Sequence, residues 1–166
     1  TDVPKGTPVK DIKTAAVIGC GTMGGGIAMC FADAGIPVKV LEGSQEALDR
    51  GMAKVRNNYE VSVKRGSLAA DEMERRFARI EPVLDYAAIG DQDVVIEAVF
   101  EQMDVKQEVF RKLDETMKDG ALILSNTSAL DIDEIAGVTK RPQDIAGAHF
   151  FSPANVMKLL EVVKGS

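Results

Sequence analysis

Residues 15–24 read Ala-Ala-Val-Ile-Gly-Cys-Gly-Thr-Met-Gly, and this stretch decides the fold. Its four leading apolar residues are typical of a short parallel strand that is buried on both faces. Gly19, Gly21 and Gly24 follow with the spacing G-x-G-x-x-G, and residues 22–34 have a helical composition. A strand, a glycine turn and a helix in direct succession predict a site for the phosphates of a dinucleotide.

Each glycine of the turn has its own expected role. Gly19 permits the tight turn, Gly21 lets the backbone approach a pyrophosphate, and Gly24 allows the helix to pack closely on the strand. Thr22 and Met23 lie in the first helical turn, where free N–H groups and the positive end of the helix dipole attract phosphate. A structural glycine corner and a flavin site are the alternatives to a nicotinamide dinucleotide.

An acidic residue is expected at the end of the second strand of such a unit. Residues 38–41 form a second apolar run, and Glu42 follows directly. A carboxylate there can accept hydrogen bonds from both ribose hydroxyls and repels a 2′-phosphate, so the sequence favours NAD over NADP.

Strand and helix patterns alternate along the rest of the chain. Ser44 is a good N-cap for a long helix to about Arg65, and a short helix precedes Ile80. Further strands are predicted over 93–99, 121–124, 145–150 and 159–163, with helical segments over 105–117 and 131–136. This pattern predicts an α/β fold of the doubly wound Rossmann type. We expect a mainly parallel sheet with helices on both faces and a helical insertion after the second strand.

The first 12 residues, rich in Pro, Gly and Lys without periodicity, predict a linker, so the domain is expected over residues 13–166. Thr14–Ala32 carries no charge, but five glycines interrupt it, which argues against a membrane span.

Composition narrows the classes of partner. The chain of 166 residues has 26 Asp and Glu against 20 Lys and Arg, and 5% aromatic residues, which argues against a nucleic-acid partner. His149 is the single histidine and there are 2 cysteines, so no metal site is expected.

In an open parallel sheet, ligands bind at the carboxyl ends of the strands. Three of the predicted strands are followed by polar residues. The expected cofactor-binding residues there are Ala98, Val99, Glu101, Lys106 and Asn126.

His149 ends another predicted strand and is a candidate general base, because imidazole exchanges protons near neutral pH. Glu161, flanked by apolar residues, is the candidate carboxylate that orients it. Ser128 is a candidate donor to a substrate oxygen. The alternatives are a structural histidine and an Asn126–Ser128 segment that only caps the next helical turn.

Several separated motifs resemble the L-3-hydroxyacyl-CoA dehydrogenases, in the order Gly19–Gly24, Val95–Glu101, Ser125–Ser128 and His149–Pro153, with Met157–Leu159 after them. The resemblance covers about Lys13 to the C-terminus. Ser152 stands where the family usually has Asn.

The resemblance implies NAD-dependent oxidation of a 3-hydroxyacyl-CoA to the 3-ketoacyl-CoA. It makes His149 the base, Glu161 its partner and Ser128 a ligand of the substrate's 3-oxygen. It places Glu42 at the adenosine ribose, and Glu101 and Lys106 near the nicotinamide.

The family also has a following helical domain, absent from this chain, that closes the substrate cleft. The linker-like start resembles that of multifunctional fatty-acid β-oxidation enzymes, in which an enoyl-CoA hydratase domain precedes the dehydrogenase part.

The alternative functions are a dehydrogenase of another small hydroxy acid and a non-catalytic NAD-binding module. The expected compartment is the bacterial cytoplasm, with the peroxisome as the alternative.

Overall fold

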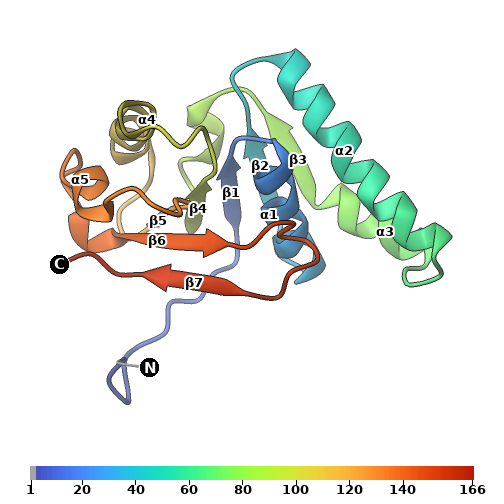
Figure 1. Cartoon of the computed structure of the whole chain (residues 1–166), viewed down its shortest axis with the longest axis horizontal. Coiled ribbons are helices and arrows are strands. Elements are labelled where there is room, and N and C mark those ends of the chain that lie inside the picture. Colours follow the sequence, from blue (N-terminus) through green and yellow to red (C-terminus); the bar gives the residue numbers. More distant parts are fainter. Residues whose placement is uncertain (1–2) are drawn as a thin grey trace.

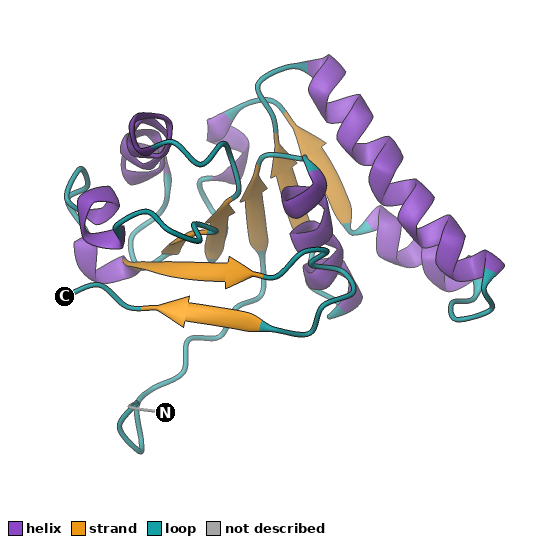
Figure 2. Ribbon diagram, in the orientation of Figure 1, coloured by secondary structure: helices purple, strands orange, loops and turns teal. Residues whose placement is uncertain are grey.

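Seven strands form one sheet in the computed structural model, which describes residues 3–166 (Figures 1 and 2). The strand order is β3-β2-β1-β4-β5-β6-β7, and β1 to β6 run parallel. The strands are β1 (Ala15–Ile18), β2 (Val38–Leu41), β3 (Ile80–Val83), β4 (Val94–Glu97), β5 (Leu122–Ser125), β6 (Ile145–Phe150) and β7 (Leu160–Val163). The order reverses between β1 and β4, as in the predicted Rossmann fold.

Two cores lie on opposite faces of this sheet, and the strand sequences explain why. In β1, Ala15 and Val17 pack into one core, and Ala16 and Ile18 pack into the other. Successive side chains of a strand point to opposite faces, so a strand covered on both faces is apolar throughout. This confirms the two-layered helical covering predicted from the sequence.

Helices α1 (Thr22–Asp33), α2 (Gln45–Lys64) and α3 (Ala70–Ala78) cover the first face. Helices α4 (Met103–Thr116) and α5 (Ile132–Ala136) cover the other, on the opposite side of the sheet in Figure 1. Two short 3-10 helices, η1 (Tyr86–Ile89) and η2 (Pro142–Asp144), complete the elements of residues 3–166. The Ser44 hydroxyl accepts a hydrogen bond from the Ala47 N–H at 3.2 Å, so the predicted cap of α2 is present.

The predicted strands recur within one or two residues of their expected bounds, but β3 was not predicted. Its sequence is Ile-Glu-Pro-Val, with Glu81 and Pro82 exposed. Proline is tolerated there because β3 lies at the edge of the sheet. The helices α2 and α3, expected as an insertion, therefore form the connection between the parallel strands β2 and β3.

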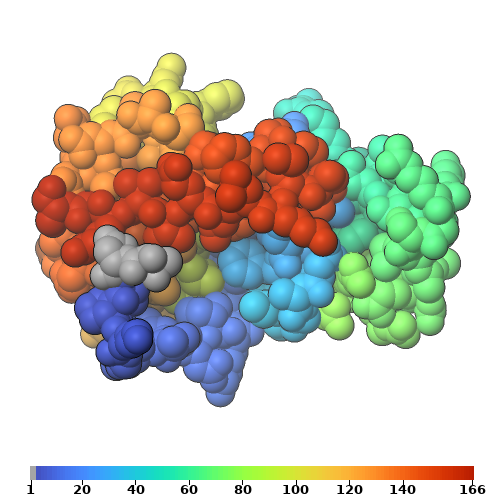
Figure 3. Space-filling model, turned by 60° about the horizontal axis from the view of Figure 1, so that its bottom comes forward, coloured from blue at the N-terminus to red at the C-terminus, as the bar shows by residue number. Residues whose placement is uncertain are grey.

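The C-terminal strand β7 runs antiparallel to β6 and forms the other edge of the sheet. Figure 3 shows the C-terminal segment, in red, crossing one face of the molecule. This segment exposes several large apolar side chains: Val156, Met157, Leu159, Leu160, Val162 and Val163.

In the described part of the predicted linker, residues 3–12, the structure has turns and no helix or strand. Thr1 and Asp2 of that linker lie outside the described residues. No helix among residues 3–166 is long and apolar enough to cross a membrane.

Candidate functional site

The glycine turn connects β1 to α1 at the carboxyl edge of the sheet. Gly19 has φ 97°, a region that favours glycine, and its N–H donates to the Leu41 carbonyl at 2.8 Å. A Cβ on Gly24 would lie 2.0 Å from the Gly19 carbonyl oxygen, whereas a Cβ on Gly21 would meet nothing within 4 Å. The backbone at Gly24 thus packs against the Gly19 carbonyl, whereas the space beside Gly21 is empty. A phosphate can therefore approach the backbone at Gly21.

The start of α1 is well suited to an anion. Gly21 is the N-cap, no side chain caps the helix, and the first turn contains no acidic residue. The N–H groups of this turn, including those of Thr22 and Met23, therefore keep their hydrogen-bonding capacity and the positive end of the helix dipole.

Glu42 lies beside this turn, as the sequence predicts. Its Oε1 accepts from the Cys20 N–H at 2.7 Å and its Oε2 accepts from the Gly43 N–H at 3.1 Å. These bonds orient the carboxylate next to the place where an adenosine ribose would follow the phosphates. Burial, together with the Glu42 charge, raises the pKa of the Cys20 thiol to about 11, so the thiol stays protonated.

A buried ionic cluster follows β4 and β5. Glu97 and Lys106 have no exposed side-chain surface, and the Lys106 Nζ lies 2.6 Å from Glu97 Oε1. The other oxygen, Oε2, accepts from the Ser125 hydroxyl at 2.6 Å. Lys106 thus contacts Glu97 in this structure and is buried at the end of β4, and its contact with the cofactor stays a prediction.

Glu101 connects this cluster to the surface. Its Oε2 lies 3.8 Å from the Lys106 Nζ, and its Oε1 accepts a hydrogen bond from the Thr127 hydroxyl. The Glu101 side chain is 41% exposed, and Ala98 and Val99 are half-buried nearby in sequence. The residues expected at the nicotinamide side therefore gather at the ends of β4 and β5.

Hydrogen bonds to other strand ends and to the following turn hold the Ser125–Ser128 segment. Asn126 Oδ1 accepts from the Phe150 N–H at 2.8 Å, which ties the end of β5 to the end of β6. Thr127 Oγ1 accepts from the Leu130 N–H at 2.9 Å, so part of the segment does cap the following turn. Ser128 is exposed, and its hydroxyl is free to meet a ligand as far as the described residues go.

His149 and Glu161 lie directly opposite each other in the β6–β7 ladder. Directly opposed residues of antiparallel strands point to the same face, with Cβ atoms about 5 Å apart. His149 is half-buried and its ring packs on Phe151 with centroids 4.6 Å apart, whereas Glu161 is exposed. Within residues 3–166 no hydrogen bond joins the two side chains. The strand register thus makes His149 and Glu161 neighbours, and no direct bond holds the imidazole against the carboxylate.

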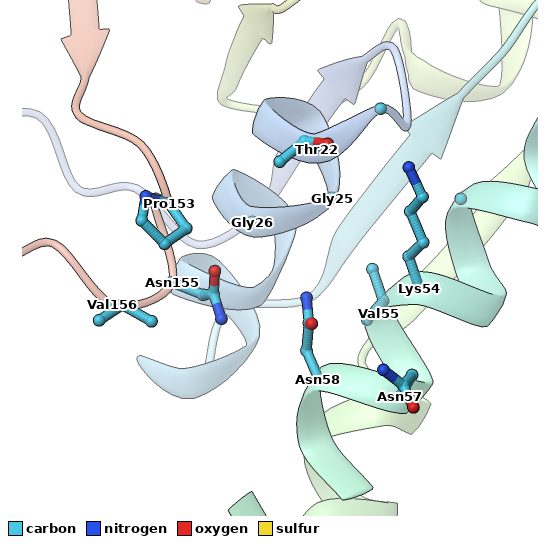
Figure 4. Close-up of a pocket in the computed structure, with 12 residues that line it drawn as sticks. Thr22, Gly25, Gly26, Lys54, Val55, Asn57, Asn58, Pro153, Asn155 and Val156 are labelled. Carbon is cyan, nitrogen blue, oxygen red and sulfur yellow. The ribbon is translucent and has the colours of Figure 1, made fainter. Parts of the chain in front are cut away.

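A cavity of about 320 Å³ adjoins the glycine turn (Figure 4). Gly21 and the first residue of α1, Thr22, line the cavity, and so do Lys54 and Asn58 of α2. Pro153, Asn155 and Val156 complete it on the side opposite Lys54 in Figure 4. Sequence reasoning missed this part of the site, because the residues from α2 lie on an ordinary polar helix face.

Gly51 explains how α2 comes so close to the turn. A Cβ on Gly51 would lie 2.3 Å from the Cys20 carbonyl oxygen. A glycine in the middle of a helix costs helical stability, and it was the signal in the sequence for this close approach.

Residues 14–166 match the family described as the 3-hydroxyacyl-CoA dehydrogenase NAD-binding domain. The chain belongs to this family. The glycine turn, the open Gly21 and the placement of Glu42 fit NAD as its cofactor, as predicted.

Similar proteins agree with this assignment. The chain is 46% identical over 156 residues to the peroxisomal bifunctional enzyme of Danio rerio, covering 94% of this chain and 21% of that protein. It is 40% identical over 155 residues to the fatty acid oxidation complex subunit alpha of a Psychrobacter species, covering 93% of this chain and 22% of that protein.

The (S)-3-hydroxybutyryl-CoA dehydrogenase of Ralstonia eutropha has a similar solved structure, with a TM-score of 0.91 and 34% identity. That match covers 93% of this chain and 55% of that one. The chain thus spans about a fifth of the multifunctional relatives and about half of this dehydrogenase.

Proposed function

We propose that this chain is the cofactor-binding part of an enzyme that oxidises L-3-hydroxyacyl-CoA to 3-ketoacyl-CoA in fatty-acid β-oxidation. The observation that carries the proposal is that His149 and Glu161 lie opposite each other in the β6–β7 ladder. His149 lies near the carboxyl end of β6, and the glycine turn follows the carboxyl end of β1, so both are at the same end of the parallel strands. Bound NAD supplies the acceptor for the hydride. A non-catalytic NAD-binding module would have no need for a histidine and a carboxylate opposed in this way.

The chain's own residues would handle the proton and orient the substrate. His149 would take the hydroxyl proton as the hydride leaves the adjacent carbon, and Glu161 would stabilise the imidazolium. Ser128, exposed at the end of β5, would donate a hydrogen bond to the 3-oxygen. The turnover test compares acyl-CoA thioesters with free hydroxy acids in the full-length protein. Oxidation of the free acids alone would support the alternative dehydrogenase instead.

The exposed apolar residues of β7 and of the preceding loop support a further domain in the full-length protein. Large exposed apolar patches mark interaction surfaces, and a helical domain packed there would close the substrate cleft. An enoyl-CoA hydratase domain before residue 1 is the other proposed neighbour, with residues 1–12 as the linker. The bacterial and peroxisomal relatives support a bacterial cytoplasm, or a peroxisome, as the compartment.

Glu42 gives a prediction about cofactor choice. We expect the chain to bind NADH at least about tenfold more tightly than NADPH, because the carboxylate repels the 2′-phosphate. Glu42→Ala should narrow this difference, because it lowers the affinity for NADH and raises the affinity for NADPH. Calorimetry measures both affinities. Glu46→Ala, an exposed carboxylate four residues away, is the control and should leave the preference unchanged. Equal affinities in the parent chain would contradict the role of Glu42.

Lys54 gives a prediction about the thioester substrate. Lys54 lines the cavity from the α2 side, whereas Gly21 and Thr22, which suit the NAD phosphates, line it from the start of α1. We therefore expect its ammonium to meet the phosphates of coenzyme A. In the full-length enzyme, Lys54→Ala should raise the KM for acetoacetyl-CoA about three- to tenfold and leave the Kd for NADH unchanged. Lys64→Ala, an exposed lysine at the far end of α2, is the matched control. A weaker NADH affinity in Lys54→Ala would instead assign the cavity to the cofactor.

A further inference from the structure

Glu97 is a charged side chain with no exposed surface, and three different segments donate to it. Its Oε1 accepts from the Lys106 Nζ at 2.6 Å and from the Val99 N–H at 2.8 Å. Its Oε2 accepts from the Ser125 hydroxyl at 2.6 Å. A buried carboxylate with every donor in place holds those donors in fixed positions. Glu97 thereby fixes the turn after β4, the first turn of α4 and the end of β5.

The charges of this cluster do not cancel. Lys106 lies 2.6 Å from Glu97 and 3.8 Å from Glu101, so two carboxylates share one ammonium. Glu97 holds the ammonium more closely and from the buried side. Among the described residues, Lys106 is the only cation within 4 Å of Glu101. The surplus negative charge therefore lies at Glu101, which is the exposed member of the cluster.

The topology places this charge in one half of the dinucleotide site. In a doubly wound sheet the ligand binds in the crevice where the strand order reverses. Here the order reverses between β1, which is followed by the glycine turn, and β4, which ends at Glu97. Glu42 lies on the side of β2, so the adenosine half extends in that direction. The nicotinamide half must then extend over the ends of β4 and β5, where Glu101 lies.

We propose that Glu97 is a positioning residue that holds the Lys106 ammonium closer to itself than to Glu101, so that the Glu101 charge is only partly neutralised and favours the oxidised cofactor over the reduced one. The oxidised nicotinamide ring carries a positive charge, and the reduced ring is neutral. A negative charge beside the ring thus stabilises the oxidised form selectively. This inference rests on the proposed function, because it requires NAD to bind with its nicotinamide over β4 and β5.

The test measures the ratio of the NAD⁺ and NADH affinities of the chain. The chain contains no tryptophan whose emission could be followed, so the emission of NADH is used to measure its binding, and NAD⁺ is measured by competition. In Glu97→Gln, Lys106 is free to move to Glu101, and we expect the affinity for NAD⁺ relative to NADH to fall about three- to tenfold. In Glu97→Gln combined with Lys106→Met, both buried charges are gone and Glu101 keeps its own, so the ratio should return toward the parent value even where the affinity for both forms falls.

Asp93→Asn is the matched control. Asp93 precedes the other end of β4 and also pairs with a lysine, Lys118, at 2.6 Å. Its replacement should leave the ratio unchanged, even if the chain becomes less stable. If Glu97 had a purely structural role, Glu97→Gln would lower the affinities for NAD⁺ and NADH equally. The second substitution, Lys106→Met, would not restore them.

Each outcome has a separate meaning. If the affinity for NAD⁺ relative to NADH is unchanged in Glu97→Gln, the inference is overturned and the proposed function stands. A lowered ratio in the double variant would have the same consequence. If the single variant does not fold, Glu101→Gln replaces it in the test, because it removes the exposed charge on which the inference depends. It should lower the ratio about three- to tenfold, and an unchanged ratio there overturns the inference. If the parent chain bound neither NAD⁺ nor NADH, the proposed function itself would fail.

Discussion

A Gly24→Ala variant should lose both stability and NAD binding. A Cβ at this position would lie 2.0 Å from the Gly19 carbonyl oxygen and 2.7 Å from its carbonyl carbon, and this neighbour is backbone that cannot rotate away. The start of α1 would have to move off the sheet. Overpacking costs about 1–3 kcal/mol, and we expect the upper end of this range against rigid backbone, which for a chain of this size lowers the Tm by about 6–12 °C. Calorimetric unfolding and NADH titration measure the two losses.

Gly21→Ala is the matched control for this prediction. A Cβ on Gly21 meets nothing within 4 Å, and its φ of −73° suits any residue. We expect the Tm to fall by no more than about 3 °C, because alanine is only a poorer N-cap than glycine. NADH binding should nevertheless be lost, since the new methyl group occupies the approach of the phosphates. A Gly24→Ala chain with parental stability, or a Gly21→Ala chain with parental affinity, would contradict these roles of the turn.

Much of the fold follows from local patterns in the sequence. The buried strand β1 is apolar at every position, and the glycine spacing fixes the turn that follows it. The edge strand β3 escaped prediction because only Ile80 is buried, while Glu81 and Pro82 face solvent. A short edge strand with one buried residue has no alternation to recognise.

The candidate site was predictable where it depends on strand ends and unpredictable where it depends on strand pairing. Polar residues after β4, β5 and β6 indicated which loops form the site. The partner of Glu97 on β5 follows only from the parallel register that sets it beside Ser125. The contact of Lys106 with the cofactor stays a prediction, and the sequence could not reveal that a buried carboxylate holds its ammonium.

The second large effect concerns His149. In the full-length enzyme, His149→Gln should lower kcat for L-3-hydroxybutyryl-CoA by about 10²- to 10⁴-fold, the usual contribution of a positioned general base. Glutamine is close in size to histidine, and the ring of His149 packs mainly on Phe151, so the fold should survive. The Kd for NADH should change little, because the groups that fit the adenosine and phosphate portions of NAD lie at Glu42 and at the start of α1.

Glu161→Gln separates an orienting role from a general structural one. Glu161 is exposed on β7 and opposes His149 in the ladder, so the amide keeps the shape and removes only the charge. We expect an intermediate fall in kcat, since the base remains but its protonated form loses a stabilising carboxylate. In the double variant the fall should be close to that of His149→Gln alone, because Glu161 acts through the imidazole. Independent, multiplying effects of the two substitutions would show that Glu161 does not work through His149, and undiminished turnover in His149→Gln would remove the histidine from the mechanism.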